Sequence, residues 1–417
     1  MKPMYRFSGG IHMHTLAHRK ATARLQLLKP DGSPCAQQPV EVNQVSHKFL
    51  FGCGVFDALN LFQEQPQEAL AFQKDRMDKW LHLFNYGTLP FYWGRYEPVE
   101  GQTAQEQTLK AARWLQSQGV TLKGHPLCWH TACADWLMNY SNQDILTHQL
   151  DRIHRDVHAF QGVIDMWDVI NEVVIMPVFD RYDNAITRIC REFGRFGLVQ
   201  AVFQAAHETN PNAVLLINDF NTSPAYEILI EGLLDKGVPI SAIGIQSHQH
   251  QGYWGAAKLE EVLERFSRFG LPIHFTENTL VSGEIMPPHI VDLNDFQVDS
   301  WPSTEEGELR QAAEITEMYQ ILFSHPLVQA ITTWDFTDGK WLHAPSGFLH
   351  ADNTLKPSYR AMEQLIHHDW ETHLTCQTDA DGCLTFEGFR GTYTLCSGKS
   401  QACLALDTDT KTCLQLV

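Results

Sequence analysis

Two glutamates in the sequence each end a short apolar run. Glu172 closes the run DMWDVINE (165–172), and Glu277 closes the run IHFTE (273–277). Such runs are typical of buried parallel strands, and the carboxyl ends of barrel strands are where active sites form. A carboxylate there is desolvated, which is costly unless it has a partner or a function. Two carboxylates facing each other would suit glycoside hydrolysis, one as proton donor and one as nucleophile or base.

Polar and aromatic residues also follow other expected strands. They are His125 and Trp129, Asn218 and Asp219, Gln246, Ser247 and His248, and Trp334 and Asp335. A simpler explanation is that such residues cap helices or bond to loop backbone. That explanation suits Asn218, Asp219, Ser247 and Asp335 well, but it suits Glu172 and Glu277 poorly.

Eight short apolar runs alternate with stretches of helical periodicity, as in repeated βα units. The expected strands are residues 49–56, 83–89, 121–127, 165–171, 214–218, 242–246, 273–276 and 330–334. The expected helices are residues 67–83, 108–118, 142–160, 188–209, 225–236, 259–269, 305–323 and 359–367. Gly119, Gly237 and Gly270 follow three of these helices as stop signals. The pattern predicts an α/β fold, a (β/α)₈ barrel over residues 47–370, and no glycine-rich fingerprint supports a dinucleotide-binding sheet.

Both ends of the chain have a different pattern. Within residues 1–46, the first 20 are expected to be a loosely packed lead-in, and residues 21–45 alternate around a Lys29-Pro30-Asp31-Gly32 turn, which predicts a β-hairpin. Residues 371–417 alternate as well and predict a hairpin or meander. The two segments could form one small accessory β module beside the barrel, or each could cap one barrel end.

The amino-acid composition limits the classes of binding partner that we expect for this protein. The 417 residues include 49 acidic and 31 basic ones, a formal charge of −18 that disfavours nucleic acid and anionic membranes. No apolar run is long enough to span a bilayer, and the first residues lack a signal peptide, so we expect a cytoplasmic protein, or a secreted one if a leader was removed. A neutral carbohydrate substrate fits this charge. The oligomeric state is left open.

Metal and disulfide chemistry have little support. The 10 cysteines are irregularly spaced, and the five that follow residue 375 contain no CxxC pair, so we expect mostly reduced thiols and no structural zinc. The 21 histidines include no HExxH motif. We predict no metal and no cofactor.

Taken in order, these motifs resemble the glycoside hydrolase family 10 xylanases. The resemblance covers residues 49–366 and rests on WDVINE (167–172), GHPLCWH (124–130), INDFN (217–221), GIQSH (244–248) and TTWDFTD (332–338) followed by Trp341. Each motif alone is weak, but their order on successive strands is specific. The resemblance implies a retaining enzyme on a (β/α)₈ barrel, with acid/base and nucleophile after strands four and seven.

The family pattern implies a role for each matching residue. Glu172 would be the acid/base and Glu277 the nucleophile, with their carboxyl groups about 5 to 5.5 Å apart, as retention requires. Further residues implied to bind or support the substrate are Asn171, which would bond the sugar 2-hydroxyl, His248 and Gln246, which would support Glu277, His125, Trp129 and Trp334, which would wall the sugar at the −1 position, and Trp341 and Trp93. Catalysis also requires Glu172 to hold its proton and Glu277 to stay ionised.

The chain departs from the family after strand two. Xylanases of this family usually carry Glu-Asn-x-x-Lys-Trp there, and alignment on Trp93 puts Leu89 and Tyr92 at the Asn and Lys positions. Two polar sugar contacts would be lost, which changes the substrate that is accepted. Arg95 could compensate, although a surface salt bridge is the simpler role.

Four hypotheses follow from the sequence. The first is a retaining hydrolase of xylan-derived β-1,4-linked oligosaccharides. The second is a hydrolase of another β-glycoside, such as a decorated oligosaccharide or a plant aryl or terpenoid glycoside. A catalytically silent carbohydrate-binding barrel is the third, and the pair Glu172 and Glu277 argues against it. A metal-dependent hydrolase is the fourth, and no ligand spacing supports it. Endo and exo action are both left open.

Overall fold

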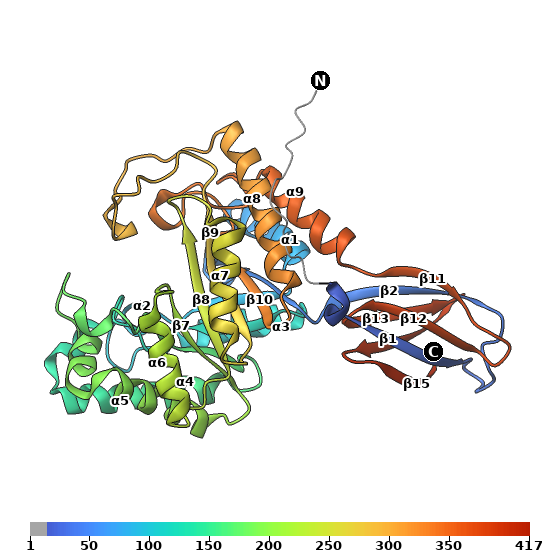
Figure 1. Cartoon of the computed structure of the whole chain (residues 1–417), viewed down its shortest axis with the longest axis horizontal. Coiled ribbons are helices and arrows are strands. Elements are labelled where there is room, and N and C mark those ends of the chain that lie inside the picture. Colours follow the sequence, from blue (N-terminus) through green and yellow to red (C-terminus); the bar gives the residue numbers. More distant parts are fainter. Residues whose placement is uncertain (1–14) are drawn as a thin grey trace.

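The computed structural model describes residues 15–417, so the first 14 residues of the predicted lead-in lie outside the described residues. Eight parallel strands form a closed barrel in the order β10-β3-β4-β5-β6-β7-β8-β9 (Figure 1). The strands are β3 (Leu50–Gly54), β4 (Tyr86–Pro90), β5 (Thr121–His125), β6 (Met166–Asn171), β7 (Val214–Asp219), β8 (Ala242–Gln249), β9 (Ile273–Leu280) and β10 (Val328–Thr333). The prediction of a (β/α)₈ barrel with an accessory β module is confirmed.

Helices connect the strands and surround the barrel. They are α1 (Gln67–Leu83), the short α2 (Trp93–Tyr96), α3 (Gln105–Ser117), α4 (Asn142–Phe160), α5 (Ala185–Thr209), α6 (Pro224–Asp235), α7 (Gly255–Ser267), α8 (Glu305–Ser324) and α9 (Pro357–Gln364). Gly119, Gly237 and Gly270 have φ of +81°, +73° and +66°, so they stop α3, α6 and α7 in the left-handed conformation that glycine tolerates.

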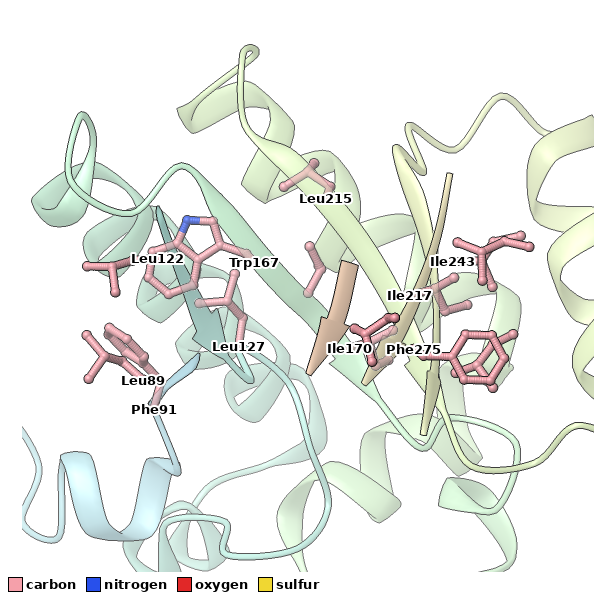
Figure 2. Close-up of a cluster of buried hydrophobic side chains, with 14 of the residues drawn as sticks. Leu89, Phe91, Leu122, Leu127, Trp167, Ile170, Leu215, Ile217, Ile243 and Phe275 are labelled. Atoms are coloured by element: carbon pink, nitrogen blue, oxygen red, sulfur yellow. The ribbon is translucent and has the colours of Figure 1, made fainter. Parts of the chain in front are cut away.

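Apolar side chains on the strands pack outward against these helices. Figure 2 shows part of this core, in which Trp167, Ile170 and Phe275 from β6 and β9 join residues of the neighbouring strands. A separate buried cluster is formed by Tyr86, Met166, Leu216, Ala242 and Ala330. Its members come from five different strands, so they meet inside the barrel near the strand beginnings. The barrel is therefore filled at its base, and polar side chains are left for its upper end.

The two ends of the chain build one accessory β module (Figure 1). Its strands are β1 (Lys20–Leu28), β2 (Pro39–His47), β11 (His373–Gln377), β12 (Cys383–Phe389), β13 (Gly391–Ser397), β14 (Ser400–Leu406) and β15 (Thr410–Gln415). One sheet has the order β12-β1-β15 and the other β11-β2-β13-β14. A hydrophobic core of its own fills the module. The alternative in which each chain end caps one end of the barrel is wrong.

The predicted N-terminal hairpin is also wrong in its pairing. Both strands exist, but β1 pairs with β12 and β15 while β2 pairs with β11 and β13. Alternate residues of β1, such as Ala23 and Leu25, and of β2, such as Val40 and Val42, are buried in the same core. The two strands thus belong to opposing sheets of a sandwich. Alternation predicts which face is buried, and not which strand is the neighbour.

The module is fastened to the barrel by Arg19 and Trp370. The Arg19 guanidinium donates to the carbonyls of Phe323, His325 and Val328 at 2.8, 2.7 and 2.6 Å. The Trp370 ring stacks on Phe323 with ring centroids 4.1 Å apart. These contacts lie where α8 ends and β10 begins, at the end of the barrel away from the strand carboxyl ends. The module therefore packs against the end of the barrel opposite the strand carboxyl ends.

No helix among residues 15–417 is long and apolar enough to cross a membrane. All 10 cysteines are free thiols, and the same described residues contain no group of three or more histidine, cysteine, aspartate or glutamate side chains placed to hold a metal ion.

Candidate active site

Both glutamates lie at the carboxyl ends of barrel strands, and both have an unusual backbone. Glu172 directly follows β6 and has φ of +56°, and Glu277 lies in β9 with φ of +55°. The pairing of β9 with β8 and β10 shifts register around Glu277, as at a β-bulge. The left-handed conformation costs free energy in residues other than glycine, and it concentrates at functional sites. The backbone is thus shaped to aim these two side chains.

A chain of three amides joins the two carboxylates. Asn171 Oδ1 accepts hydrogen bonds from Asn218 Nδ2 at 2.8 Å and Gln246 Nε2 at 3.0 Å. Asn218 also donates to Glu277 Oε1 at 2.8 Å, and Gln246 donates to Glu172 Oε1 at 3.3 Å. The structure therefore brings Asn171, Gln246 and the two glutamates together, but Gln246 donates to Asn171 and Glu172 and not to Glu277, which the sequence had led us to expect.

The amide group of Asn171 has one hydrogen-bonding atom to spare. Its Oδ1 accepts two N–H groups, which fixes the orientation of the amide. Its Nδ2 is buried and has no partner among the described residues. An unpaired buried donor is costly, so this N–H is available to a ligand placed between the carboxylates.

Glu172 is set up to keep its proton. Desolvation by burial, followed by the charge of Glu277, raises the pKa of Glu172 from 4.5 to about 8. The indole N–H of Trp129 donates to Glu172 Oε2 at 2.9 Å and acts in the opposite direction. The carboxyl group is protonated at neutral pH, as a general acid must be.

Glu277 is set up to stay ionised. Burial alone would raise the pKa of Glu277, but the charge of His125 and the hydrogen bond with His248 outweigh it and lower the pKa below the ordinary value. His248 Nε2 lies 3.2 Å from Glu277 Oε2, and His125 Nδ1 lies 3.9 Å from Oε1. The two glutamates therefore have opposite protonation states, although they lie in one site.

His125 is held by a buried ionic group that the sequence analysis missed. Its Nδ1 lies 2.7 Å from Asp168 Oδ2, and Lys123 Nζ lies 2.7 Å from the same oxygen. Burial acts to raise the pKa of Asp168, but Lys123 and His125 together lower it. The available signal was that each of two adjacent strands contains one charged residue, Lys123 in β5 and Asp168 in β6. Charged residues are rarely buried without a partner.

Aromatic rings form a wall on one side of the carboxylates. Trp334 lies edge-on to His125 with ring centroids 5.2 Å apart, and Trp341 packs against His248 at 4.5 Å. The ring of Tyr92 lies 5.5 Å from that of Trp129. Aromatic faces suit the apolar face of a pyranose, so this aromatic wall is a suitable surface for a sugar ring.

The structure does not bring Trp93 to the two carboxylates, which corrects the sequence-based expectation. The indole N–H of Trp93 donates to Glu97 Oε2 at 3.0 Å, and its ring packs under the guanidinium of Arg152 at 4.7 Å. Trp93 is the first residue of α2 and points into the core, whereas the preceding Tyr92 faces the site. Arg95 forms no salt bridge within residues 15–417, and its guanidinium lies 5.7 Å from the centroid of the Tyr92 ring instead.

The capping explanation holds for Asp219 but is wrong for Asn218. Asp219 accepts the backbone N–H groups of Val174 and Asn221, each at 2.9 Å, so it does satisfy loop backbone. Asn218 instead bonds to Asn171 and Glu277. An asparagine at a strand end has the same local pattern in either role, so only the position of β7 between β6 and β8 reveals the difference.

The chain is similar in sequence to proteins of a known family. Residues 91–365 match the model of glycosyl hydrolase family 10. The chain is 26% identical over 341 residues to an endo-1,4-beta-xylanase/feruloyl esterase of Xylanibacter ruminicola, covering 75% of this chain and 44% of that protein. It is 27% identical over 266 residues to an endo-1,4-beta-xylanase of Geobacillus stearothermophilus, covering 60% of this chain and 76% of that protein.

The fold is also shared with solved structures. Xylanase 10B from Thermotoga petrophila, solved in complex with xylobiose, aligns with a TM-score of 0.62 and 22% identity, over 77% of this chain and 95% of that one. At this identity the likeness concerns the fold. The chain spans less than two thirds of the first relatives that it matches, 44% of the Xylanibacter protein and 64% of a beta-1,4-xylanase of Dictyoglomus thermophilum.

Proposed function

The chain belongs to glycosyl hydrolase family 10, and on this basis we propose that it is a retaining hydrolase of β-1,4-linked oligosaccharides derived from xylan. The observation that carries the proposal is the opposite tuning of two neighbouring carboxyl groups. The pKa of Glu172 is raised to about 8, and that of Glu277 is lowered. Pairs of carboxyl groups whose environments push their pKa values apart identify the acid and the nucleophile.

In the first step, Glu277 attacks the anomeric carbon of the sugar while Glu172 gives its proton to the departing glycosidic oxygen. A bond forms between Glu277 and the sugar as the bond to the leaving group breaks. The free N–H of Asn171 would donate to the sugar hydroxyl next to the anomeric carbon, a contact that strengthens in the transition state.

In the second step, Glu172 is ionised and acts as a base. It removes a proton from a water molecule, which attacks the anomeric carbon and releases Glu277. His248, Asn218 and His125 stabilise the Glu277 carboxylate both before attack and as it leaves. Two displacements at one carbon preserve the β configuration.

A second candidate substrate is another β-glycoside, such as a decorated oligosaccharide or an aryl or terpenoid glycoside. It is favoured by the residues that follow β4. Leu89 is completely buried, and Tyr92 packs against Trp129 and His125, so neither offers the amide or ammonium group that the family usually places there. The chemistry is the same for both substrates.

A silent carbohydrate-binding barrel would have no use for this arrangement. Holding one carboxyl group protonated beside an ionised one, each on a left-handed backbone, has a cost in folding free energy. A binding surface needs aromatic rings and hydrogen bonds, but it does not need two neighbouring carboxyl groups in different protonation states.

The test is product formation from a panel of xylo-oligosaccharides and aryl β-glycosides by wild type, Glu277→Gln and Glu172→Gln. Glu277→Gln is expected to lose turnover of every substrate. Glu172→Gln should retain much more activity on aryl glycosides with good leaving groups, because these need no proton. Equal activity of wild type and both variants would sink the assignment. Activity on aryl glycosides or other β-glycosides without activity on xylo-oligosaccharides would keep the mechanism and change the substrate.

A further inference from the structure

The long segment between β9 and α8, residues 281–304, is a folded excursion and not a simple connection (Figure 1). Val281, Met286 and Trp301 are buried in a small hydrophobic cluster of their own. The Trp301 indole N–H donates to the carbonyl of Glu284 at 2.9 Å, and its ring packs against Phe296 at 4.8 Å. Loops of this length with a core of their own usually have a function.

The excursion contacts the segment that follows the neighbouring strand β8. Gln251, which follows β8, donates to the carbonyls of Pro287 and Ile290 at 3.0 and 2.7 Å. The backbone N–H of Met286 donates to the carbonyl of His250 at 3.0 Å. The excursion is thereby directed toward the ends of β7 and β6.

At its far side the excursion reaches the segment that follows β6 and carries Glu172. Arg181 of that segment pairs with Asp292 at 2.5 Å and also with Asp295. The segment that carries Arg181 is itself held in place, because Arg191 of α5 donates to the carbonyls of Pro177 and Phe179. We call the contact of Arg181 with the two aspartates the Arg181 bridge.

The bridge spans the side of the barrel mouth that a leaving group would use. Trp334, Tyr92 and His125 follow or end β10, β4 and β5, three of the four consecutive strands β10-β3-β4-β5, so the sugar that is attacked would lie on that side. Glu172 must hand its proton to a group on the other side. That side runs from β6 to β9, and the bridge joins the segments that follow these two strands. Phe220 directly follows β7, which lies between β6 and β9 in the barrel order, and its side chain is exposed.

We propose that the Arg181 bridge limits the size of the leaving group that the site can accept. The enzyme would therefore cleave small β-glycosides in preference to internal bonds of a long polymer. This inference depends on the proposed function, since it assumes that Glu172 protonates the leaving group. Phe220 offers the leaving group an apolar face, which suits a single sugar or aromatic ring. The bridge is solvent-exposed, so its ion pairs are weak and are screened by salt.

The test compares kcat/KM for soluble long-chain xylan with kcat/KM for an aryl β-xyloside and xylotriose. Wild type should prefer the small substrates. Arg181→Ala should raise the ratio of polymer to small-substrate activity about fivefold, the size expected when an exposed ion pair is removed. Added salt at about 0.5 M should raise the ratio in wild type but not in Arg181→Ala.

Arg188→Ala is the matched control. Arg188 pairs with Asp183 within one segment and is similarly exposed, so its loss removes an ion pair without opening the bridge. The double variant Arg181→Asp/Asp292→Arg should restore the wild-type ratio in part. An unchanged ratio in Arg181→Ala, or the same increase in Arg188→Ala, would overturn the inference while leaving the proposed function intact. Absence of turnover of every substrate would overturn the proposed function and this inference with it.

Discussion

Trp129 and Glu172 are joined by a hydrogen bond 2.9 Å long, in which the indole N–H donates to Oε2 of the carboxyl group. The bond connects the aromatic wall to the proposed proton donor. Burial and Glu277 raise the pKa of Glu172, and Trp129 lowers it, so the value of about 8 is a balance between them. The ring therefore has an electrostatic role in addition to its contact with a sugar.

Replacement of Trp129 by phenylalanine should move this balance. The donor is lost while an aromatic ring remains, so the ionised form of Glu172 is less stabilised and its pKa rises further. The basic limb of the kcat/KM profile should move to higher pH by about 1 unit, the effect of one hydrogen bond to a charged group. A shift toward lower pH, or none, would contradict the assigned role of this hydrogen bond.

The wild-type profile of kcat/KM against pH should be bell-shaped. Activity should fall on the basic side near pH 8, where Glu172 loses its proton, and on the acidic side below pH 4.5, where Glu277 gains one. Initial rates with one aryl glycoside over a broad pH range provide the measurement. A basic limb that is unchanged in Glu172→Gln would show that another group controls it.

The same carboxyl group should affect stability. Because the folded protein holds the Glu172 proton up to about pH 8 and the unfolded chain releases it near 4.5, the free energy of unfolding falls as the pH rises through that range. Glu172→Gln cannot ionise and escapes this loss. Its Tm should exceed that of wild type by a few degrees at about pH 9 and be close to it at about pH 5. Thermal unfolding of both proteins at both pH values provides the measurement. A difference in Tm between Glu172→Gln and wild type that is the same at the two pH values would refute the prediction.

Asn218→Ala should reduce catalysis while leaving the fold intact. The substitution removes a donor to Glu277 and one of the two N–H groups that orient the amide of Asn171, so that only Gln246 still holds it. We expect kcat to fall about 100-fold, as when one preorganised donor is lost, with a small change in KM. Asn212→Ala, at an exposed position before β7, is the control and should behave as wild type. A large rise in KM with normal kcat would mean that Asn218 acts in binding instead.

Arg19→Ala should destabilise the protein without changing the site. Three carbonyl groups at the junction of barrel and module lose their donor, which should reduce the free energy of unfolding by about 2–4 kcal/mol. The value of kcat/KM should stay the same, because the junction is at the opposite end of the barrel. Arg24→Ala, exposed on β1, provides the comparison in denaturant unfolding. Equal stability of the two variants would mean that the module contributes little to the barrel.

Tyr92→Lys should change the substrate preference. It restores the residue type that the family usually has after strand two, where this chain places an aromatic ring against Trp129 and His125. The ratio of xylo-oligosaccharide to aryl-glycoside activity should rise, because a donor for sugar hydroxyls replaces an apolar contact. A ratio that falls or stays constant would indicate that the aromatic ring at position 92 already serves xylose.

Local patterns along the chain were enough to predict the barrel and to single out the two glutamates. All eight strands and the longer helices between them were predictable, although the short α2 was not, and the predicted bounds of α1 and α4 agree with the structure. Apolar periodicity and helix stop signals are local properties. The positions of Glu172 and Glu277 at strand ends were also visible, since a carboxylate next to a buried strand stands out against its neighbours.

Local patterns did not predict which residues contact each other, and the folded structure was needed to show this. It separated β1 from β2, placed Asn218 between Asn171 and Glu277, turned Trp93 away from the site, and brought Arg181 to aspartates more than 100 positions further along the chain. Local patterns specify only which face of an element is buried. The neighbour across that face depends on how distant elements close into a barrel or a sandwich. An asparagine that caps a helix and one that donates to a buried carboxylate have the same local sequence pattern.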